Sequence, residues 1–362
     1  MVKPPLSPVT LKDIAEHTGL SIMTVSRVVR GRPDVSATSR RKVLAAVQRL
    51  GYIPNPAARL LVTRSAQDAR GSRIIGTIFS REVVTSHSYF AGIIQGIADE
   101  ARQHDCHLLF GYGLGEASEP AEYPKMLREM MTRWIILVGK VPPRFVQQLK
   151  GTGFSLVLAD MHPPIRGVDA VVCDDAQAAY DATRHLIKLG HRRIALIRGP
   201  ARHPFSQALT AGYQRALTEA DLPLRDGLIL DAPFQPQGGH AAAEALLKGP
   251  HRPTAIFTND DLAIGALRAI HEHGLRVPED IAVVGFDDIE YAAHTTPPLT
   301  TVAVPKEEMG RLAVRQAIAQ MEQEDRHVFS TTVVAHTLVV RASCGAGIIA
   351  APSAQRDARR KS

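Results

Sequence analysis

Cysteine is scarce in this chain of 362 residues, tryptophan occurs once, and no apolar run approaches the roughly 20 residues that cross a bilayer. The three cysteines, Cys106, Cys173 and Cys344, are far apart and odd in number. This pattern excludes a disulfide framework and a clustered metal site, and it suits a reducing compartment. The first ten residues lack a secretory apolar core. We therefore expect a cytoplasmic protein with no membrane partner and no cofactor.

The excess of positive charge is confined to the start of the chain. Residues 1–72 hold 12 Lys and Arg against 4 Asp and Glu, a balance of +8, whereas the rest of the chain comes to −1. Such a distribution is expected of a small polyanion-binding module joined to a near-neutral body. Charge alone leaves a solvated basic face open as the alternative. The 45% hydrophobic share indicates globular domains, and the length suits two or three of them.

Three short helices are predicted within residues 9–54, after a disordered lead over 1–8. Thr10 and Asp13 form a capping box, and Gly19 stops the first helix. Ser21 can cap a second helix over 22–29, and Ser36 a third that ends near Gly51. The first two helices are joined by a tight turn, which is typical of a helix-turn-helix headpiece that binds DNA.

The second helix of such a headpiece enters the major groove with its N-terminal side chains. Ile22, Met23, Thr24, Ser26 and Arg27 are therefore the candidate base and phosphate contacts. Ile22 and Met23 can pack on thymine methyl groups, although burial of one of them in the headpiece core is an open alternative.

A short helix is also predicted over residues 55–63. Asn55 is an N-cap and Pro56 suits the first helical position, but nine residues cannot hold a helix alone in water. We expect this hinge helix to form only when it packs against DNA or a partner. Residues 64–72 are predicted to be a flexible linker.

From Arg73 the pattern changes to buried strands alternating with helices, which predicts doubly wound parallel sheets in an α/β body over 73–341. Its length favours two subdomains with a cleft between them. We expect the first subdomain over about 73–172 plus 304–330, and the second over about 173–303 plus 331–341. Residues 342–362 are predicted to be a disordered tail.

Seven sequence strings occur in order along nearly the whole chain: VTLKDIA (9–15), TVSRV (24–28), GYIPN (51–55), LGHRRIA (189–195), TNDDLA (258–263), VVGFDD (283–288) and PLTTV (298–302). With these strings the chain resembles the lactose/galactose-repressor family of bacterial transcription regulators. The resemblance implies a homodimer whose headpieces bind an inverted-repeat operator on double-stranded DNA. It also implies a body like that of periplasmic sugar-binding proteins, which would hold a small effector in its cleft.

The resemblance also assigns roles to individual residues. Leu61 matches the leucine that family hinge helices insert into the minor groove, and such a wedge kinks the duplex; a dimer contact without a DNA role is the alternative. The set of predicted DNA contacts is Thr10, Ser21, Ile22, Met23, Thr24, Ser26, Arg27, Arg30, Tyr52, Asn55, Ala58, Arg59 and Leu61.

The predicted effector contacts follow parallel strands, at the sheet edge where open α/β sheets bind ligands. They are Ser80, Asp160, Gln207, Phe234, Asn259, Asp261 and Asp287. Asn259 and Asp260 can instead cap a helix, with Asp260 the favoured cap, and Phe234 can be a plain core residue. Gln207 stands where many family members have an arginine that grips the effector. We expect the effector to be a sugar or sugar derivative.

No catalytic pattern accompanies these residues. The stretch Gly111–Gly115 lacks the spacing of a dinucleotide loop, and no nucleophile-elbow or metal-ligand cluster occurs. We therefore predict a repressor that is not an enzyme. The rival interpretations are a solute-binding protein and a sugar-modifying enzyme fused to a DNA-binding module.

Overall fold

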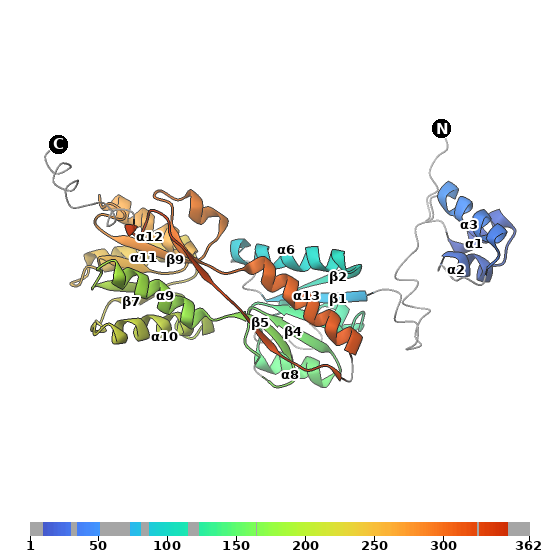
Figure 1. The fold of residues 1–362 in the computed structure, drawn as a ribbon, viewed down its shortest axis with the longest axis horizontal. Coiled ribbons are helices and arrows are strands. Elements are labelled where there is room, and N and C mark those ends of the chain that lie inside the picture. The colour runs from blue at the N-terminus through green and yellow to red at the C-terminus, as the bar shows by residue number, and fades with distance from the viewer. Residues whose placement is uncertain are drawn as a thin grey trace. The chain divides into compact units, whose positions relative to one another are not determined.

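A computed structural model describes residues 10–29, 35–50, 73–80, 87–114, 123–163, 165–323 and 326–346 of the chain. The chain divides into two compact units, Met1–Arg73 and Ile74–Ser362. Each unit is described by itself below, and their elements are labelled in Figure 1. Among the described residues, no helix combines the length and the apolar character that a membrane span needs.

The first unit contains three helices: α1 (Leu11–Thr18), α2 (Ile22–Val29) and α3 (Ala37–Leu50). The predicted capping box of Thr10 and Asp13 is present, and Gly19 ends α1 in the left-handed conformation with φ 64°. Ser21 and Ser36 accept backbone hydrogen bonds from the residues three positions later, which confirms both as caps. The small core holds residues from all three helices: Ile14, Ala15, Val25, Val28, Val43 and Ala46.

The first sheet of the larger unit has the strand order β11-β5-β4-β3-β1-β2. The pairs from β1 through β3, β4 and β5 to β11 are all parallel. The strands are β1 (Arg73–Ser80), β2 (Cys106–Leu114), β3 (Trp134–Val138), β4 (Ser155–Ala159), β5 (Asp169–Cys173) and β11 (Thr331–Val334).

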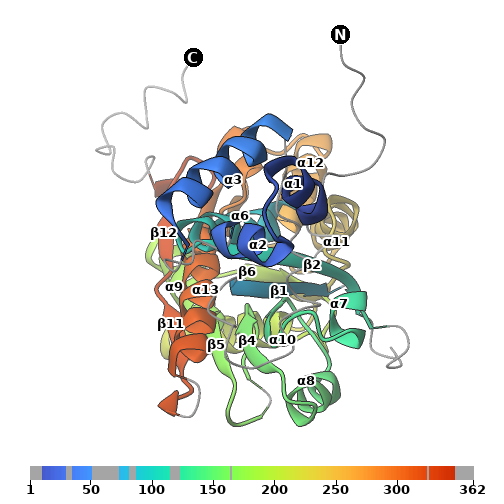
Figure 2. The ribbon, with the colours of Figure 1, turned by 90° about the vertical axis from the view of Figure 1, so that its right-hand side faces the viewer.

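Helices cover both faces of this sheet, as the continuous apolar strands predict. Helices α6 (His87–Gln103) and α13 (Lys306–Gln323) pack side by side on one face, where Ile93 and Ile97 of α6 meet Ile75 of β1 (Figure 1). The short α7 (Lys125–Arg128) and α8 (Pro143–Gly151) pack on the other (Figure 2).

The second sheet has the strand order β12-β10-β9-β8-β6-β7. It is parallel except for β12, which runs antiparallel to β10. The strands are β6 (Ile194–Arg198), β7 (Ile229–Asp231), β8 (Ala255–Phe257), β9 (Ala282–Asp287), β10 (Thr300–Ala303) and β12 (Thr337–Val339). Helices α9 (Asp175–Lys188) and α10 (Pro204–Glu219) pack on one face, and α11 (Pro236–Lys248) and α12 (Asp260–Glu272) on the other. A 3-10 helix, η2 (Glu290–His294), follows β9.

The predicted assignment of residues 331–341 to the second subdomain is wrong for strand β11. Residues 331–334 pair in parallel with β5 of the first sheet, and only residues 337–339 join the second sheet. The chain therefore passes between the two sheets three times, after β5, after β10 and after β11. Sequence periodicity could not show this third crossover, because two adjacent short strands look alike whichever sheet they join.

The predicted disordered tail begins too early. Ser343 and Cys344 are buried, and the Ser343 hydroxyl donates to the carbonyl of Val283 at 2.6 Å and accepts from the amide of Thr300 at 2.8 Å. These bonds tie residues 342–346 to β9 and β10. Residues 347–362 lie outside the described residues.

Candidate functional sites

The N-terminal end of α2 presents apolar side chains to solvent. Ile22 is 50% exposed and Met23 67%, whereas Val25 and Val28 one turn later are buried against α1 and α3. These exposures decide the alternative left open by the sequence, because neither Ile22 nor Met23 belongs to the buried core. Arg27 is exposed as well. Helix α2 therefore presents two apolar side chains in its first turn and a cation in its last turn, all outside the core.

Some of the remaining predicted DNA contacts lie among the described residues, and others lie outside them. The Thr10 hydroxyl donates to the Asp13 carboxylate at 2.7 Å, so its side chain is already used in capping α1. Ser21 and Thr24 lie at the start of α2 with their hydroxyl oxygens 2.9 Å apart. Arg30, Tyr52, Asn55, Ala58, Arg59 and Leu61 lie outside the described residues.

Ends of strands in the first sheet carry two of the predicted effector contacts. Ser80 ends β1 with its side chain 1% exposed, and its hydroxyl has no hydrogen-bond partner among the described residues. Asp160 directly follows β4 in the left-handed region, φ 66°, and its carboxylate accepts from the Tyr89 hydroxyl at 2.8 Å. Tyr89 lies in the first turn of α6, so this hydrogen bond ties Asp160 to that helix.

Asp287 ends β9 in the second sheet, and its side chain is 8% exposed. Burial raises the pKa of Asp287 well above its usual range; Asp260 raises it further, Lys306 lowers it, and Asp261 and Asp160 add smaller increases. Asp160 therefore acts electrostatically on Asp287, although the two residues end strands of different sheets. The structure brings these two predicted contacts into one electrostatic environment.

Asn259, not Asp260, is the cap of helix α12. Asn259 caps α12, because its side-chain oxygen accepts from the Leu262 amide at 3.3 Å. Asp260 is fully buried and accepts from the Thr301 hydroxyl at 2.6 Å and the Ile289 amide at 2.9 Å. The prediction that Asp260 is the cap is wrong, because its carboxylate bonds to Thr301 of strand β10 and to Ile289 in the loop that follows β9.

Asp261 is partly buried, and burial raises the pKa of its carboxyl. Phe234 is also partly buried, with its ring centroid 5.2 Å from the ring of His203 and 6.1 Å from that of Phe205. A side chain at Gly199 would collide with the Phe234 ring. These contacts favour the core interpretation of Phe234. Gln207 is exposed near the start of α10.

Asp175, at the start of α9, was not among the predicted contacts. Burial raises the pKa of its carboxyl well above the usual range, and the carboxylates of Asp160 and Asp174 raise it further. We call Asp160, Asp175 and Asp287 the acidic cluster, since the same three carboxylates, after burial, raise the pKa of the Tyr89 hydroxyl. The sequence signal was the pair Asp174-Asp175 directly after a strand, for which turn and effector roles explain the pattern better than metal binding.

A sequence profile described as bacterial regulatory proteins of the lacI family matches residues 10–55, and one described as a periplasmic binding protein-like domain matches residues 183–344. Catabolite control protein A from Priestia megaterium is 33% identical over 319 residues, which cover 87% of this chain and 93% of that protein. The ribose operon repressor of Haemophilus influenzae is 32% identical, with 92% and 98% covered. The chain belongs to the lacI family.

A lacI-family chain of this kind is a DNA-binding transcriptional regulator with a small-molecule-binding body. Its structure matches the Lac repressor dimer bound to operator and the anti-inducer ONPF, with a TM-score of 0.81, 28% identity, and 93% and 99% of the two chains covered. It also matches the CelR–cellobiose complex, with a TM-score of 0.67, 28% identity, and 92% and 99% covered. The family resemblance seen in the sequence, and the predicted fold class, are thereby confirmed.

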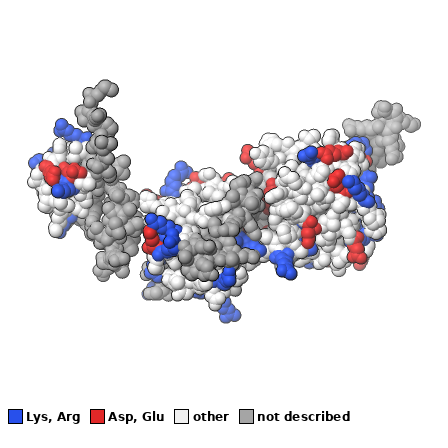
Figure 3. All heavy atoms as spheres, turned by 180° about the vertical axis from the view of Figure 1, so that it is seen from behind, with Lys and Arg blue, Asp and Glu red and all other residues white. Residues whose placement is uncertain are grey.

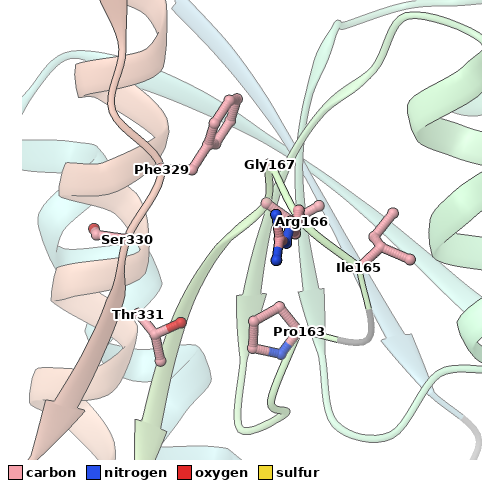
Figure 4. A pocket seen from close by; sticks show the side chains of 8 residues that line it. Pro163, Ile165, Arg166, Gly167, Phe329, Ser330 and Thr331 are labelled. Carbon is pink, nitrogen blue, oxygen red and sulfur yellow. The ribbon is translucent and has the colours of Figure 1, made fainter.

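A separate hollow of about 480 Å³ lies in the first subdomain (Figure 4). None of the predicted effector contacts lines it; the lining residues are Pro163, Ile165, Arg166, Gly167, Val168, Phe329, Ser330 and Thr331.

Where basic and acidic side chains are drawn on the larger unit in Figure 3, they are interspersed, which agrees with its near-neutral balance. Across the described residues, no group of three or more His, Cys, Asp or Glu side chains could hold a metal ion.

The acidic cluster predicts how the stability of the body depends on pH. A carboxyl whose pKa is raised by folding lowers stability once it ionises, so the cost appears as pH rises through the raised pKa. We expect Asp175→Asn to stabilise the body by about 1 kcal/mol at pH 8, or roughly 2–4 °C in Tm, and to leave it unchanged at pH 4. Thermal unfolding at the two pH values measures this. An equal gain at both would contradict charge repulsion as the cause.

Proposed function

We propose that this protein is a repressor that binds an inverted-repeat operator as a homodimer and responds to a small effector held between the two subdomains of its body. It is not an enzyme in this proposal, and it works in the cytoplasm on chromosomal DNA. Support comes from relatives that are named repressors, such as the ribose operon repressor of Haemophilus influenzae, and from the similarity to the Lac repressor dimer bound to its operator.

The observation that carries the DNA-binding part is the exposed apolar start of α2. Ile22 and Met23 are adjacent and exposed, and thymine methyl groups in the major groove are apolar partners that such side chains can pack on. Ile22 and Met23 are assigned to base edges. Ser21, Thr24, Ser26 and Arg27 are assigned to the sugar-phosphate backbone and nearby bases, and the capped Thr10 to a phosphate.

The hinge helix is proposed for residues 55–63, followed by a linker over 64–72, with a headpiece over 9–54. Arg59 and Leu61 are assigned to the minor groove at the operator centre, with Leu61 as the wedge. Tyr52, Asn55, Ala58 and Arg30 complete the DNA contacts. A hinge this short is stable only in a bound pair, so separation of the two hinges releases the operator.

The effector is proposed to be a sugar or sugar derivative. Asp160, Asp261 and Asp287 supply acceptors, Asn259 an amide, and the buried Ser80 hydroxyl a further group without a hydrogen-bond partner among the described residues. Polyhydroxylated ligands suit such a set, because each hydroxyl can satisfy a buried polar atom. Gln207 is assigned to the rim of the site, whereas Phe234, which packs against His203 and Phe205, is assigned to the core. The names of two relatives, a ribose operon repressor and CelR bound to cellobiose, point the same way.

The test uses an operator selected from random DNA by the wild-type protein. Met23→Ala should weaken binding to that operator by about 1–3 kcal/mol, roughly 5- to 150-fold, because it removes one base contact. Binding to random DNA should change less than twofold, since phosphate contacts remain. Fluorescence anisotropy at fixed salt measures both affinities.

Leu44→Ala is the matched control, because Leu44 is an exposed apolar residue as well, 50% against 67% for Met23, but lies on α3, outside the proposed contacts. It should leave both affinities within twofold of wild type. Equal losses of specific and nonspecific binding in Met23→Ala would show that α2 does not read bases. Absence of any preferred palindrome in the selection would refute the proposed function itself.

A further inference from the structure

Helices α6 and α13 approach each other unusually closely at the end where α13 begins. A side chain at Gly96 of α6 would collide with the backbone of Glu307, and one at Gly310 with the backbone of Ile93. A Cβ atom at Gly92 would lie 2.8 Å from the Cβ of Lys306. Glycines therefore let the first turn of α13 lie directly on α6, and the Lys306 side chain starts from a fixed position in the first subdomain.

The ammonium group of Lys306 reaches the second subdomain. Its Nζ donates to the backbone carbonyls of Asp287 and, at 3.0 Å, of Asp288, the two residues that end and follow β9. Both residues have positive φ, 110° and 49°, a conformation that non-glycine residues rarely adopt without support. Lys306 supplies that support, because it holds both carbonyls of the strained turn.

The surroundings of this contact belong to the proposed effector site. The Lys306 ammonium lies 5.9 Å from the centroid of the Tyr89 ring, and the Tyr89 hydroxyl donates to Asp160. The Asp288 carboxylate is held from the other side by Arg341 at 2.8 Å. One cation thus touches the backbone of the effector contact Asp287 and lies beside the tyrosine that orients the effector contact Asp160.

We propose that Lys306 is a positioning residue that straps the two subdomains together at the effector site, and through which occupancy at Asp287 is transmitted to subdomain orientation and operator affinity. The proposal rests on the proposed function. The strap favours one closure of the body in the absence of effector. A ligand that moves the Asp287–Asp288 turn strains or releases both hydrogen bonds, and the preferred closure changes with them.

The test compares Lys306→Met, which keeps most of the stem and loses the donors, with Lys306→Arg, which keeps the charge. Without effector, Lys306→Met should weaken binding to the selected operator at least about fivefold, the lower end of usual coupling energies, because the body samples more orientations. Lys306→Arg should stay within twofold. Hydrogen exchange at the amides of residues 287–290 should be faster in Lys306→Met and unchanged in Lys306→Arg.

Arg311→Met is the matched control, because Arg311 lies on the same helix but pairs only with Glu307 and Glu308 among the described residues. It should change neither readout. Gly92→Ala is a second variant that displaces the strap without removing a charge, and it keeps the test open if Lys306→Met does not fold. It should weaken operator binding in the same direction.

Outcomes separate the strap from the function. Wild-type preference for a palindrome, combined with unchanged operator affinity in Lys306→Met or, if that variant does not fold, in Gly92→Ala, would overturn the strap and leave the proposed function intact. Faster exchange at residues 287–290 without a loss of operator affinity would reduce Lys306 to a local structural role and also overturn the proposal. Loss of affinity in Lys306→Met but not in Lys306→Arg or Arg311→Met would support it.

Discussion

Asp169→Ala is expected to lower the free energy of unfolding of the body by about 3–5 kcal/mol, because it removes the shared acceptor of a buried hydrogen-bond network. The Asp169 side chain is fully buried and accepts hydrogen bonds from Gln320 and His327, each at 2.6 Å, and from the Ser330 amide at 2.7 Å. Alanine leaves three donors from α13 and from the segment before β11 without their acceptor. Urea unfolding at fixed protein concentration measures the loss.

Asp231→Ala is the control for this change. Asp231 also carries an ion pair, with Arg198 at 2.7 Å, but its side chain is 49% exposed. Solvent screens such pairs, so the expected loss is below about 1 kcal/mol. Similar losses in the two variants would mean that Asp169 does not hold the end of α13 and the start of β11 in place.

Asp160→Asn is expected to weaken effector binding at least about tenfold, because a charged acceptor contributes roughly 1.5–3 kcal/mol to each hydrogen bond it makes to a ligand. The effector is first found by thermal shift of the wild-type protein against pentoses, hexoses, glycosides, sugar acids and purines. Calorimetry with that compound then gives the affinity of each variant. Operator affinity without effector should stay within twofold of wild type, since the Asp160 carboxylate accepts from Tyr89 of the same subdomain and is not one of the Lys306 contacts to Asp287 and Asp288.

Asp231→Asn serves as the control for Asp160→Asn. Asp231 is also a carboxylate at the end of a parallel strand, β7, but it lies outside the acidic cluster. Its effector affinity should match that of the wild type. If Asp160→Asn binds the effector as tightly as the wild type, Asp160 has no place in the effector site. Unchanged effector binding with impaired operator release would instead place Asp160 in the coupling between the sites.

The parts of the fold that follow from local patterns were predictable. The capping box at Thr10, the stop at Gly19, and the caps Ser21 and Ser36 each depend on residues within four positions, and all were found. Alternation of apolar strands with helices gave the two parallel sheets. These features need no knowledge of distant contacts.

Features that depend on distant partners could not be predicted. The destination of β11 is set by its pairing with β5, which lies more than 150 residues earlier. Asp260 resembled a helix cap in the sequence, and only Thr301 and Ile289 reveal its buried role. Asp175 became a candidate because Asp160 lies close enough to raise its pKa. The contact of Lys306 with the carbonyls of Asp287 and Asp288 could not be predicted, because backbone carbonyls carry no sequence signal.

The third passage of the chain between the sheets has a consequence for synthesis on the ribosome. The second sheet takes five of its six strands from residues 194–303, whereas the first sheet lacks its edge strand β11 and its covering helix α13 until residues 306–334 have been made. The subdomain encoded later can therefore become compact sooner, whereas in the subdomain encoded earlier the part of the sheet face that α13 covers stays exposed until α13 is made. A chaperone that shields nascent apolar surface would be needed longest by the half of the body that emerges first.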